Sequence, residues 1–294
     1  METTVPTRVG LIGWPVAHSR SPAMHNAAFE ELGMNWEYLL LPVQPDHIHE
    51  AVRGLRGFGF AGANVTVPHK QAVMEALDEV TMEAQIIGAV NTIVNREGQL
   101  IGYNTDALGF LRAIREAGFE PRECRAVLLG AGGASRALLY ALLATRARVT
   151  LVNRTLARAR ALAEQFGTLF RTSIPTLPFS QHHQLQQALD QADLLVNATS
   201  VGMHPNIEES PLPSAATIPS DLTVYDLVYN PRETQLLSQA RAADARAIDG
   251  LGMLVHQGAV AFSLWTGEPA PVEVMRVAAD ASGYPSASTK EQQE

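Results

Sequence analysis

The chain has 294 residues, about twice the ~150 residues of a typical domain, so we expect two domains. Hydrophobic residues make up 46% of it and charged residues 18%, which excludes a disordered chain and suffices for a sizeable core. The net charge of −8 comes without a basic stripe, which argues against a nucleic acid or membrane partner. The single cysteine, Cys124, excludes a disulfide framework and a thiolate zinc site.

The apolar runs and the start of the chain predict a soluble, cytoplasmic protein. No run approaches the ~18 residues of a membrane-spanning helix, and the opening METTVPTRVG has no signal-peptide pattern. The polar residues 283–294 are expected to form a disordered tail.

In the first part of the chain, short apolar runs alternate with helical patterns. Strands are predicted at 9–13, 38–43, 62–67 and 89–94. Helices are predicted at 22–32, with Ser21 as its cap, and at 45–55 and 70–77. Such alternation is typical of βαβ units and a mostly parallel sheet.

A second alternation begins near Thr105. Helices are predicted at 106–116, 134–145 and 155–166, and strands at 126–129, 148–152, 194–198 and 224–228. From residue 251 the pattern is helical, at 251–265 and 271–281. These last helices need a surface, so we expect them to return to the first domain. The predicted division is a first domain of residues 1–105, completed by helices within 250–282, and a second domain of 106–249.

A glycine-rich turn follows the strand predicted at 126–129. The turn consists of Gly130, Ala131, Gly132, Gly133 and Ala134 and opens a helix, which is the context of the Rossmann dinucleotide fingerprint. Gly130 permits the tight turn, Gly132 lets the backbone approach a pyrophosphate, and the helix N-terminus attracts the anion. Because Ser135 stands where the motif has its third glycine, the motif alone is a weak signal.

The next strand ends in Asn153, Arg154 and Thr155, with Arg158 one helical turn further on. An NAD enzyme carries Asp or Glu here to bind the ribose hydroxyls, whereas arginine can bind a 2′-phosphate. The segment therefore favours NADP. The alternative is two solvated arginines in an arginine-rich chain.

Buried strands of the first domain are expected to end in four polar clusters, at 18–21, 64–70, 88–92 and 102–106. Ligands of parallel α/β sheets bind beyond the carboxyl ends of the strands, and these side chains suit a small, polyhydroxylated anion. Each cluster also has a structural interpretation: Ser19, Ser21 and Asp106 as helix caps, Asn64 and Thr66 as cross-strand pairs, Asn91 and Asn104 as turn formers.

Lys70 and Asp106 form the one Lys–carboxylate combination among these clusters. Only two of the 22 basic residues are lysines, Lys70 and Lys290, and composition alone is compatible with arginine codon bias. Reduction of a ketone needs a proton for the developing alkoxide, which an ammonium beside a carboxylate can supply. Arginine holds its proton too tightly for this role.

The chain closely resembles the shikimate dehydrogenase family from about residue 8 to 266. The matching segments, in family order, are 17–25 (AHSRSPAMH), 62–70 (GANVTVPHK), 88–92 (GAVNT), 102–106 (GYNTD), 130–134 (GAGGA), 153–155 (NRT), 197–203 (NATSVGM), 226–231 (DLVYNP) and 249–258 (DGLGMLVHQG). The resemblance implies NADPH-dependent reduction of 3-dehydroshikimate to shikimate, in the chorismate pathway to aromatic amino acids. It also implies a cleft between two α/β domains.

By motif, the resemblance assigns roles to particular residues. Ser19 and Ser21 would hold the substrate carboxylate, with Tyr229 near them. The ring hydroxyls would be bound by Asn64, Thr66, Asn91, Asp106 and Gln257, and Lys70 with Asp106 would be the catalytic pair. Residues 130–134 would bind the pyrophosphate, and Asn153, Arg154, Thr155 and Arg158 the adenosine phosphate. Thr199, Leu227 and Gly250, with Met253 as a weaker candidate, would line the path to the nicotinamide.

Several alternatives stay open. A quinate- or aminoshikimate-preferring relative would share the scaffold, and a catalytically silent NADP-binding sensor would lack Lys70 or Asp106, both of which are present. The protein is expected to be a monomer or a homodimer. No metal is expected, because the pairs His47/His49 and His182/His183 lack partners at ligand spacing. We expect His18 and His25 to pack or hydrogen-bond rather than transfer protons.

Overall fold

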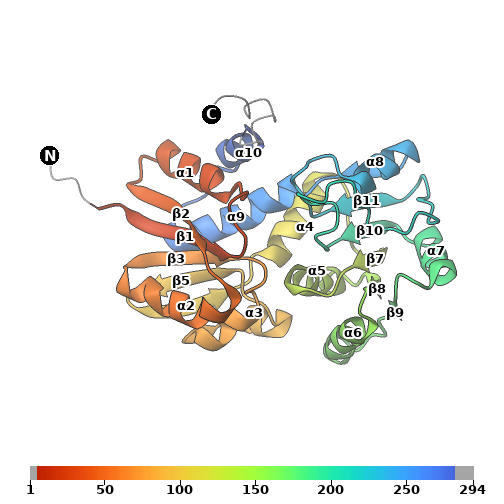
Figure 1. Ribbon diagram of the computed structural model, residues 1–294, viewed down its shortest axis with the longest axis horizontal. Helices are drawn as coiled ribbons and strands as arrows, with labels where there is room; N and C mark the ends of the chain where they lie inside the picture. Colours follow the sequence, from red (N-terminus) through yellow and green to blue (C-terminus); the bar gives the residue numbers. More distant parts are fainter. Residues whose placement is uncertain (1–4, 282–294) are drawn as a thin grey trace, which may run out of the picture.

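The computed structural model describes residues 5–281, so the predicted tail lies outside the described residues. The chain forms two six-stranded sheets, each covered by helices on both faces (Figure 1). No helix within the described residues is long and apolar enough to span a membrane.

The first sheet is mixed. Its order is β2-β1-β3-β5-β6-β4, and its strands are β1 (Thr7–Gly13), β2 (Trp36–Pro42), β3 (Phe60–Val65), β4 (Glu79–Val80), β5 (Thr92–Arg96) and β6 (Gln99–Tyr103). Strand β1 is parallel to β2 and β3, whereas β5 is antiparallel to both of its neighbours. The β5–β6 hairpin was not among the predicted elements; its turn at Glu97-Gly98 has positive φ at both residues.

Helices cover the two faces of this sheet. One face packs against α1 (Ser21–Glu31), α9 (Leu251–Thr266) and α10 (Val272–Ala281), through residues such as Val9, Leu11 and Phe29 against Phe262 and Met275. The chain's last helices therefore lie on its first sheet, beside α1 (Figure 1). The other face packs against α2 (Ile48–Gly57), α3 (Met82–Ile87) and the 3-10 turn η2 (Ala72–Ala76), and a further 3-10 turn, η1 (Pro45–His47), leads into α2.

The helix predicted at 70–77 is wrong, because only the 3-10 turn η2 forms there. The carbonyl of Lys70 accepts a hydrogen bond from the amide of Val90 at 2.7 Å. This bond ties the first residue of the segment to the chain before β5 instead of to the next helical turn.

The second sheet is parallel throughout, with the order β12-β11-β10-β7-β8-β9. Its strands are β7 (Arg125–Leu129), β8 (Arg148–Val152), β9 (Thr176–Leu177), β10 (Leu194–Asn197), β11 (Thr223–Asp226) and β12 (Arg246–Ile248). Read from β9, the order is the 3-2-1-4-5-6 of dinucleotide-binding Rossmann domains, whose crevice opens between the first and fourth strands. Here those strands are β7 and β10.

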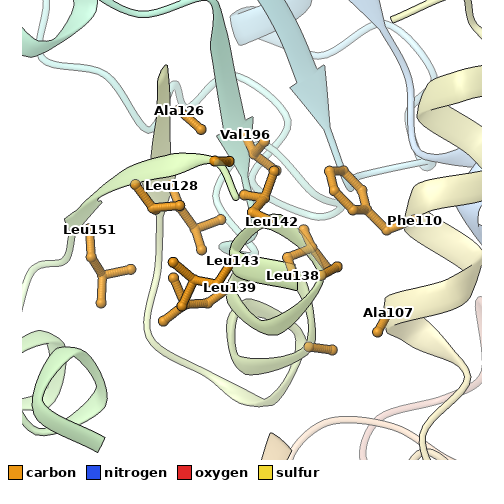
Figure 2. Close-up of a cluster of buried hydrophobic side chains, with 14 of the residues drawn as sticks. Ala107, Phe110, Ala126, Leu128, Leu138, Leu139, Leu142, Leu143, Leu151 and Val196 are labelled. Carbon is orange, nitrogen blue, oxygen red and sulfur yellow. The ribbon is translucent and has the colours of Figure 1, made fainter. Parts of the chain in front are cut away.

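Side chains alternate between the two faces of this sheet because strand residues point to opposite sides in turn. Leu128 and Val196 face a core built with α4 (Asp106–Glu116), α5 (Gly133–Ala144) and α6 (Leu156–Phe170), and Figure 2 shows Leu138 and Leu142 of α5 in it beside Phe110 of α4. The opposite face packs against α7 (His182–Asp190) and α8 (Gln235–Ala242).

The core of the second sheet continues into the first domain. Ile87 and Ala89 belong to the same buried cluster as Phe110, and so does Met253 at the start of α9. Helices α4 and α9 pack against each other between the sheets (Figure 1). We propose the domain boundaries at the two passages that lead into these helices, near residues 105 and 250.

Candidate active site

A cavity of about 320 Å³ lies where the two domains meet. Every residue predicted to bind substrate lines it: Ser19, Ser21, Asn64, Thr66, Lys70, Asn91, Asp106, Tyr229 and Gln257. From the predicted cofactor set, Ala134, Thr199, Leu227 and Gly250 also line it, together with Met253. The other predicted cofactor residues lie outside the cavity lining, in the loops after β7 and β8 and in the first turns of the helices α5 and α6 that follow them.

Lys70 and Asp106 meet at this cavity. The ammonium Nζ of Lys70 donates to Oδ2 of Asp106 at 2.5 Å, and the two side chains are 13% and 5% exposed. Nδ2 of Asn91 donates to the other carboxylate oxygen at 2.8 Å. These two hydrogen bonds fix the orientation of the Asp106 carboxylate toward Lys70. The low exposure of both side chains strengthens the attraction between their charges.

The polar residues Asn64, Thr66, Asn91 and Asp106 lie at one edge of the first sheet. Strands β3 and β6 end there, at Val65 and Tyr103, whereas Asn91 precedes β5. The expectation that Asn91 follows a strand end is therefore corrected. Because β5 runs antiparallel, its start lies at the edge where β3 and β6 end.

Asn91 and Asn104 organise the start of α4. Oδ1 of Asn91 accepts from the amide of Thr105 at 2.7 Å, and its Nδ2 donates to Oγ1 of Thr105 at 2.9 Å. Oδ1 of Asn104 accepts from the amides of Asp106 and Ala107. Capping of α4 by Asp106 is therefore wrong: Asn104 supplies the acceptor, and the Asp106 carboxylate is left for Lys70 and Asn91.

The serine cluster stands at the start of α1. The helix begins at Ser21 itself, so the predicted cap at Ser21 is wrong; Oγ of Ser19 accepts from the amide of Ser21 at 3.2 Å. Ser19 also donates to the Ser21 hydroxyl at 3.2 Å. Burial raises the pKa of Tyr229, while a hydrogen bond with Ser19 and the charge of Arg20 act in the opposite direction.

Asn64 makes three hydrogen bonds within the protein, which leaves less of its side chain for a substrate than predicted. Its Nδ2 donates to the Asn91 carbonyl and to Oγ1 of Thr92, and its Oδ1 accepts from the Tyr38 hydroxyl at 2.8 Å. Both amide hydrogens are thereby used, so only the second lone pair of Oδ1 remains for a ligand. Thr66, two residues further on, lines the cavity directly.

The glycine loop approaches Lys70. Gly130 directly follows β7 and has φ +112°, as the tight turn requires. A Cβ at Gly133 would lie 3.1 Å from the Cβ of Lys70, so this glycine permits close contact between the loop and the proposed proton donor. Ser135, in place of the third glycine, is buried and accepts from the amide of Gly132 at 3.3 Å.

Two exposed arginines follow β8. Arg154 and Arg158 form no ion pair with any described residue, and Nδ2 of Asn153 donates to the carbonyl of Thr155 at 2.9 Å. The segment 153–158 contains no carboxylate that would repel a phosphate.

A buried network holds the loops after β10 and β11. Oδ1 of Asp226 accepts from the amide of Val228 at 3.0 Å and from Asn197 at 2.9 Å, and its Oδ2 accepts from the Thr234 hydroxyl at 2.7 Å. Asn197 in turn accepts from Thr199. Burial raises the pKa of Asp226 to about 6, against the opposing effect of its hydrogen bonds.

Sequence reasoning missed or set aside several contributors. His18, Trp14, Met203 and Asn230 line the cavity, and the motifs around them were the available signal. His25 lies outside the lining, buried and stacked on Tyr38 at 4.5 Å, and burial lowers its pKa to about 3, which suits packing rather than proton transfer. Among residues 5–281 no group of three His, Cys, Asp or Glu side chains could hold a metal ion.

A parallel sheet of this order, a glycine loop at its crevice and a Lys–Asp pair beside that loop are together typical of two-domain oxidoreductases. Family models agree: the shikimate dehydrogenase substrate-binding domain matches residues 11–93, shikimate/quinate 5-dehydrogenase matches 113–253, and the shikimate 5′-dehydrogenase C-terminal domain matches 250–279.

Individual relatives point the same way. A shikimate dehydrogenase (NADP+) from Methanopyrus kandleri is 52% identical, over 92% of this chain and 93% of its own. The chain is also similar to a crystal structure of a shikimate dehydrogenase in complex with NADP+, with 40% identity, a TM-score of 0.88 and coverage of 94% of this chain and 95% of that one. A second similar crystal structure is that of the Thermus thermophilus enzyme in complex with NADP(H) and shikimate, with 41% identity, a TM-score of 0.84 and coverage of 94% and 99%. The chain belongs to the shikimate dehydrogenase family.

Proposed function

We propose that this enzyme catalyses the reversible NADPH-dependent reduction of 3-dehydroshikimate to shikimate, a step of aromatic amino acid biosynthesis. The observation that carries the proposal is the Lys70–Asp106 pair, with 2.5 Å between Nζ and Oδ2, in a cavity bordered by the dinucleotide loop. The relatives named for this activity match more than nine-tenths of the chain.

The residues after β7 and β8 fit an NADP molecule. Gly132 has open space where a Cβ would be, at the N-terminus of α5, so a pyrophosphate can approach the backbone amides. Arg154 and Arg158 are exposed and free of carboxylate partners among the described residues, which suits a 2′-phosphate. When bound, the dinucleotide supplies the hydride to the substrate carbonyl carbon.

Lys70 completes the reduction in this proposal. As the carbonyl oxygen gains negative charge, the ammonium Nζ donates a hydrogen bond and then its proton, which yields the hydroxyl. In the oxidation direction the neutral amine takes the hydroxyl proton back. Asp106 holds Nζ in place, and Asn91 orients Asp106 through its second oxygen.

The remaining lining residues would position the substrate. We propose that Ser19, Ser21 and Tyr229 bind the carboxylate, and that Thr66, Asn91, Asp106 and Gln257 bind ring hydroxyls, with Asn64 contributing one acceptor. Thr199, Leu227, Gly250 and Met253 would border the nicotinamide. The grouping is supported by their common cavity.

Replacement of the proton donor tests the mechanism. We expect Lys70→Ala to lower kcat by about 10²–10⁴ with little change in KM, because the lost interaction acts mainly in the transition state. Lys70→Arg, which keeps the charge but holds its proton, should be similarly slow. Rates are followed at the nicotinamide absorbance with shikimate and NADP+. A loss below about tenfold would refute the role of Lys70, and turnover of quinate with NAD+ but not of shikimate with NADP+ would refute the substrate assignment.

We also propose a cytoplasmic enzyme that is a monomer or a homodimer. The buried, unpaired Cys124, whose pKa burial raises to about 12, suits a reducing compartment. Light scattering of the purified protein tests the oligomeric state; a tetramer would contradict this proposal.

A further inference from the structure

Arg20 is a buried cation next to the cavity. It lies between Ser19 and Ser21 in sequence and is 7% exposed. Its Nη1 donates to the carbonyl of Ala279 at 3.1 Å, and its guanidinium carbon lies 5.9 Å from the centre of the Tyr229 ring. None of the carboxylates within residues 5–281 lies within ion-pair distance of it.

Among the described residues, Arg20 thus has partial negative charges around it but no anionic partner. A carbonyl in the last turn of α10 and the face of an aromatic ring both attract a cation, yet each supplies less than a full charge. Asp280, the neighbour of Ala279 in sequence, pairs with Arg232 at 2.7 Å instead. Buried charges in proteins are normally paired, so a buried charge without an ion pair among residues 5–281 can be stabilised further by an anion that binds in the cavity.

The lining of the cavity brings no excess of basic over acidic side chains to attract an anion. Lys70 and Asp106 are the charged Lys, Arg, Asp or Glu residues of its lining, and they neutralise each other. The serine hydroxyls and Tyr229 can donate hydrogen bonds to an anion but bring no charge. Tyr229 joins the two systems, because it lines the cavity and presents its ring to Arg20.

We infer that Arg20 is a specificity-determining residue, whose buried charge makes this end of the cavity select substrates that carry a carboxylate. Its side chain stays outside the lining and acts across Ser19, Ser21 and Tyr229, which make the direct hydrogen bonds. In the low-dielectric surroundings its attraction to an incoming carboxylate is screened less than at the surface. The inference rests on the proposed function. It adds the residue whose charge lets the enzyme distinguish a ring substrate with a carboxylate from an uncharged one.

The test compares shikimate with its uncharged methyl ester, using NADP+ and three proteins: the wild type, Arg20→Met and Arg20→Lys. We expect Arg20→Met to raise KM for shikimate by about tenfold, with kcat within about threefold, because the charge acts on binding. The KM for the ester should change by less than about twofold. Arg20→Lys, which keeps the charge, should recover most of the affinity for shikimate.

Other outcomes separate the possible failures. Equal rises in KM for acid and ester in Arg20→Met, or no rise for either, would overturn the role of Arg20 and leave a packing function. A wild type that does not oxidise shikimate would refute the proposed function itself. Should Arg20→Met not fold, Arg20→Gln replaces it, and a wild type that takes acid and ester equally well contradicts the inference without any variant.

Discussion

Both carboxylate oxygens of Asp106 have partners before any substrate arrives, one in Lys70 and one in Asn91. Asn64 likewise uses both of its amide hydrogens within the protein. Such a site is preorganised, so little free energy is needed to reorient its polar groups at the moment of reaction. Catalytic residues of this kind are sensitive to changes that leave the fold intact.

Arg154 should distinguish the two dinucleotides. We expect Arg154→Ala to raise KM for NADPH by about 10- to 100-fold, since a charge-assisted hydrogen bond to a phosphate contributes about 1.5–3 kcal/mol. The KM for NADH, which has no 2′-phosphate, should change little. Steady-state kinetics with both cofactors measure this. Arg160→Ala, on the following helix α6, is the control, and equal effects of Arg154→Ala on both cofactors would contradict the phosphate contact.

The sequence could predict Lys70, Asp106 and the serines, because their motifs are local and their chemistry is particular. It could not predict the charge role that we infer for Arg20, because the partners that make it unusual, Ala279 and Tyr229, lie more than 200 residues away. The predicted capping of α4 by Asp106 was also wrong, because the acceptor at this helix start is Asn104, which was predicted only as a turn former. Either residue type can cap a helix, and only the tertiary position of Lys70 shows that the carboxylate of Asp106 is needed elsewhere.

Among the elements, long periodic segments were predicted best. The predicted bounds of α4 and β8 coincide with those observed. The short strands β4, β9 and β12 were missed because two or three residues carry no measurable periodicity. The edge strands β9 and β12 form because a neighbouring strand offers free backbone groups, which is information outside the segment.

The end of β11 contains a carboxylate that works against folding at neutral pH. The pKa of Asp226 is about 6 in the folded protein and near 3.8 unfolded, so the folded state binds its proton more tightly. This contribution to stability is present below pH 3.8 and is lost as the pH rises through 6. Its carboxylate nevertheless ties β10, β11 and α8 together.

Asp226→Asn should therefore change the pH dependence of stability. Between pH 4.5 and 7 we expect the free energy of unfolding of the wild type to fall by about 2 kcal/mol relative to the variant, which has no proton to lose here. Urea unfolding of both proteins at the two pH values measures the difference, and all other titrating groups cancel. Parallel curves for the two proteins would show that Asp226 does not titrate in this window.

For the whole molecule, the relation between the sheets is set by apolar packing and a few polar ties. Nε of Arg136, on α5 just after the glycine loop, donates to the Ile87 carbonyl of the first domain at 2.7 Å. Its Nη2 donates to Gln165 of α6 at 2.5 Å. Arg136 thus connects α5 both to the first domain and to the neighbouring helix α6.

Removal of this tie should loosen the interface. We expect Arg136→Met, which keeps the aliphatic stem, to lower the free energy of unfolding by about 1–3 kcal/mol through the lost charged hydrogen bonds. Arg125→Met is the matched control, because Arg125 pairs with Asp193 at the surface within one domain and should cost under about 1 kcal/mol. Equal losses in the two variants, measured by urea unfolding, would show that Arg136 is no more than a surface residue.

Helices α9 and α10 cover the face of the first sheet that carries Val9 and Leu11 of β1, and they pack there beside Phe29 of α1. A ribosome makes the chain from its N-terminus, so α9 and α10 cannot pack on this apolar face until residues 251–281 have been synthesised. The second sheet already has all of its strands once residue 248 has been made. Synthesis therefore reverses the usual order, in which the N-terminal domain folds first. The half of the enzyme that is made first is the last to close its core.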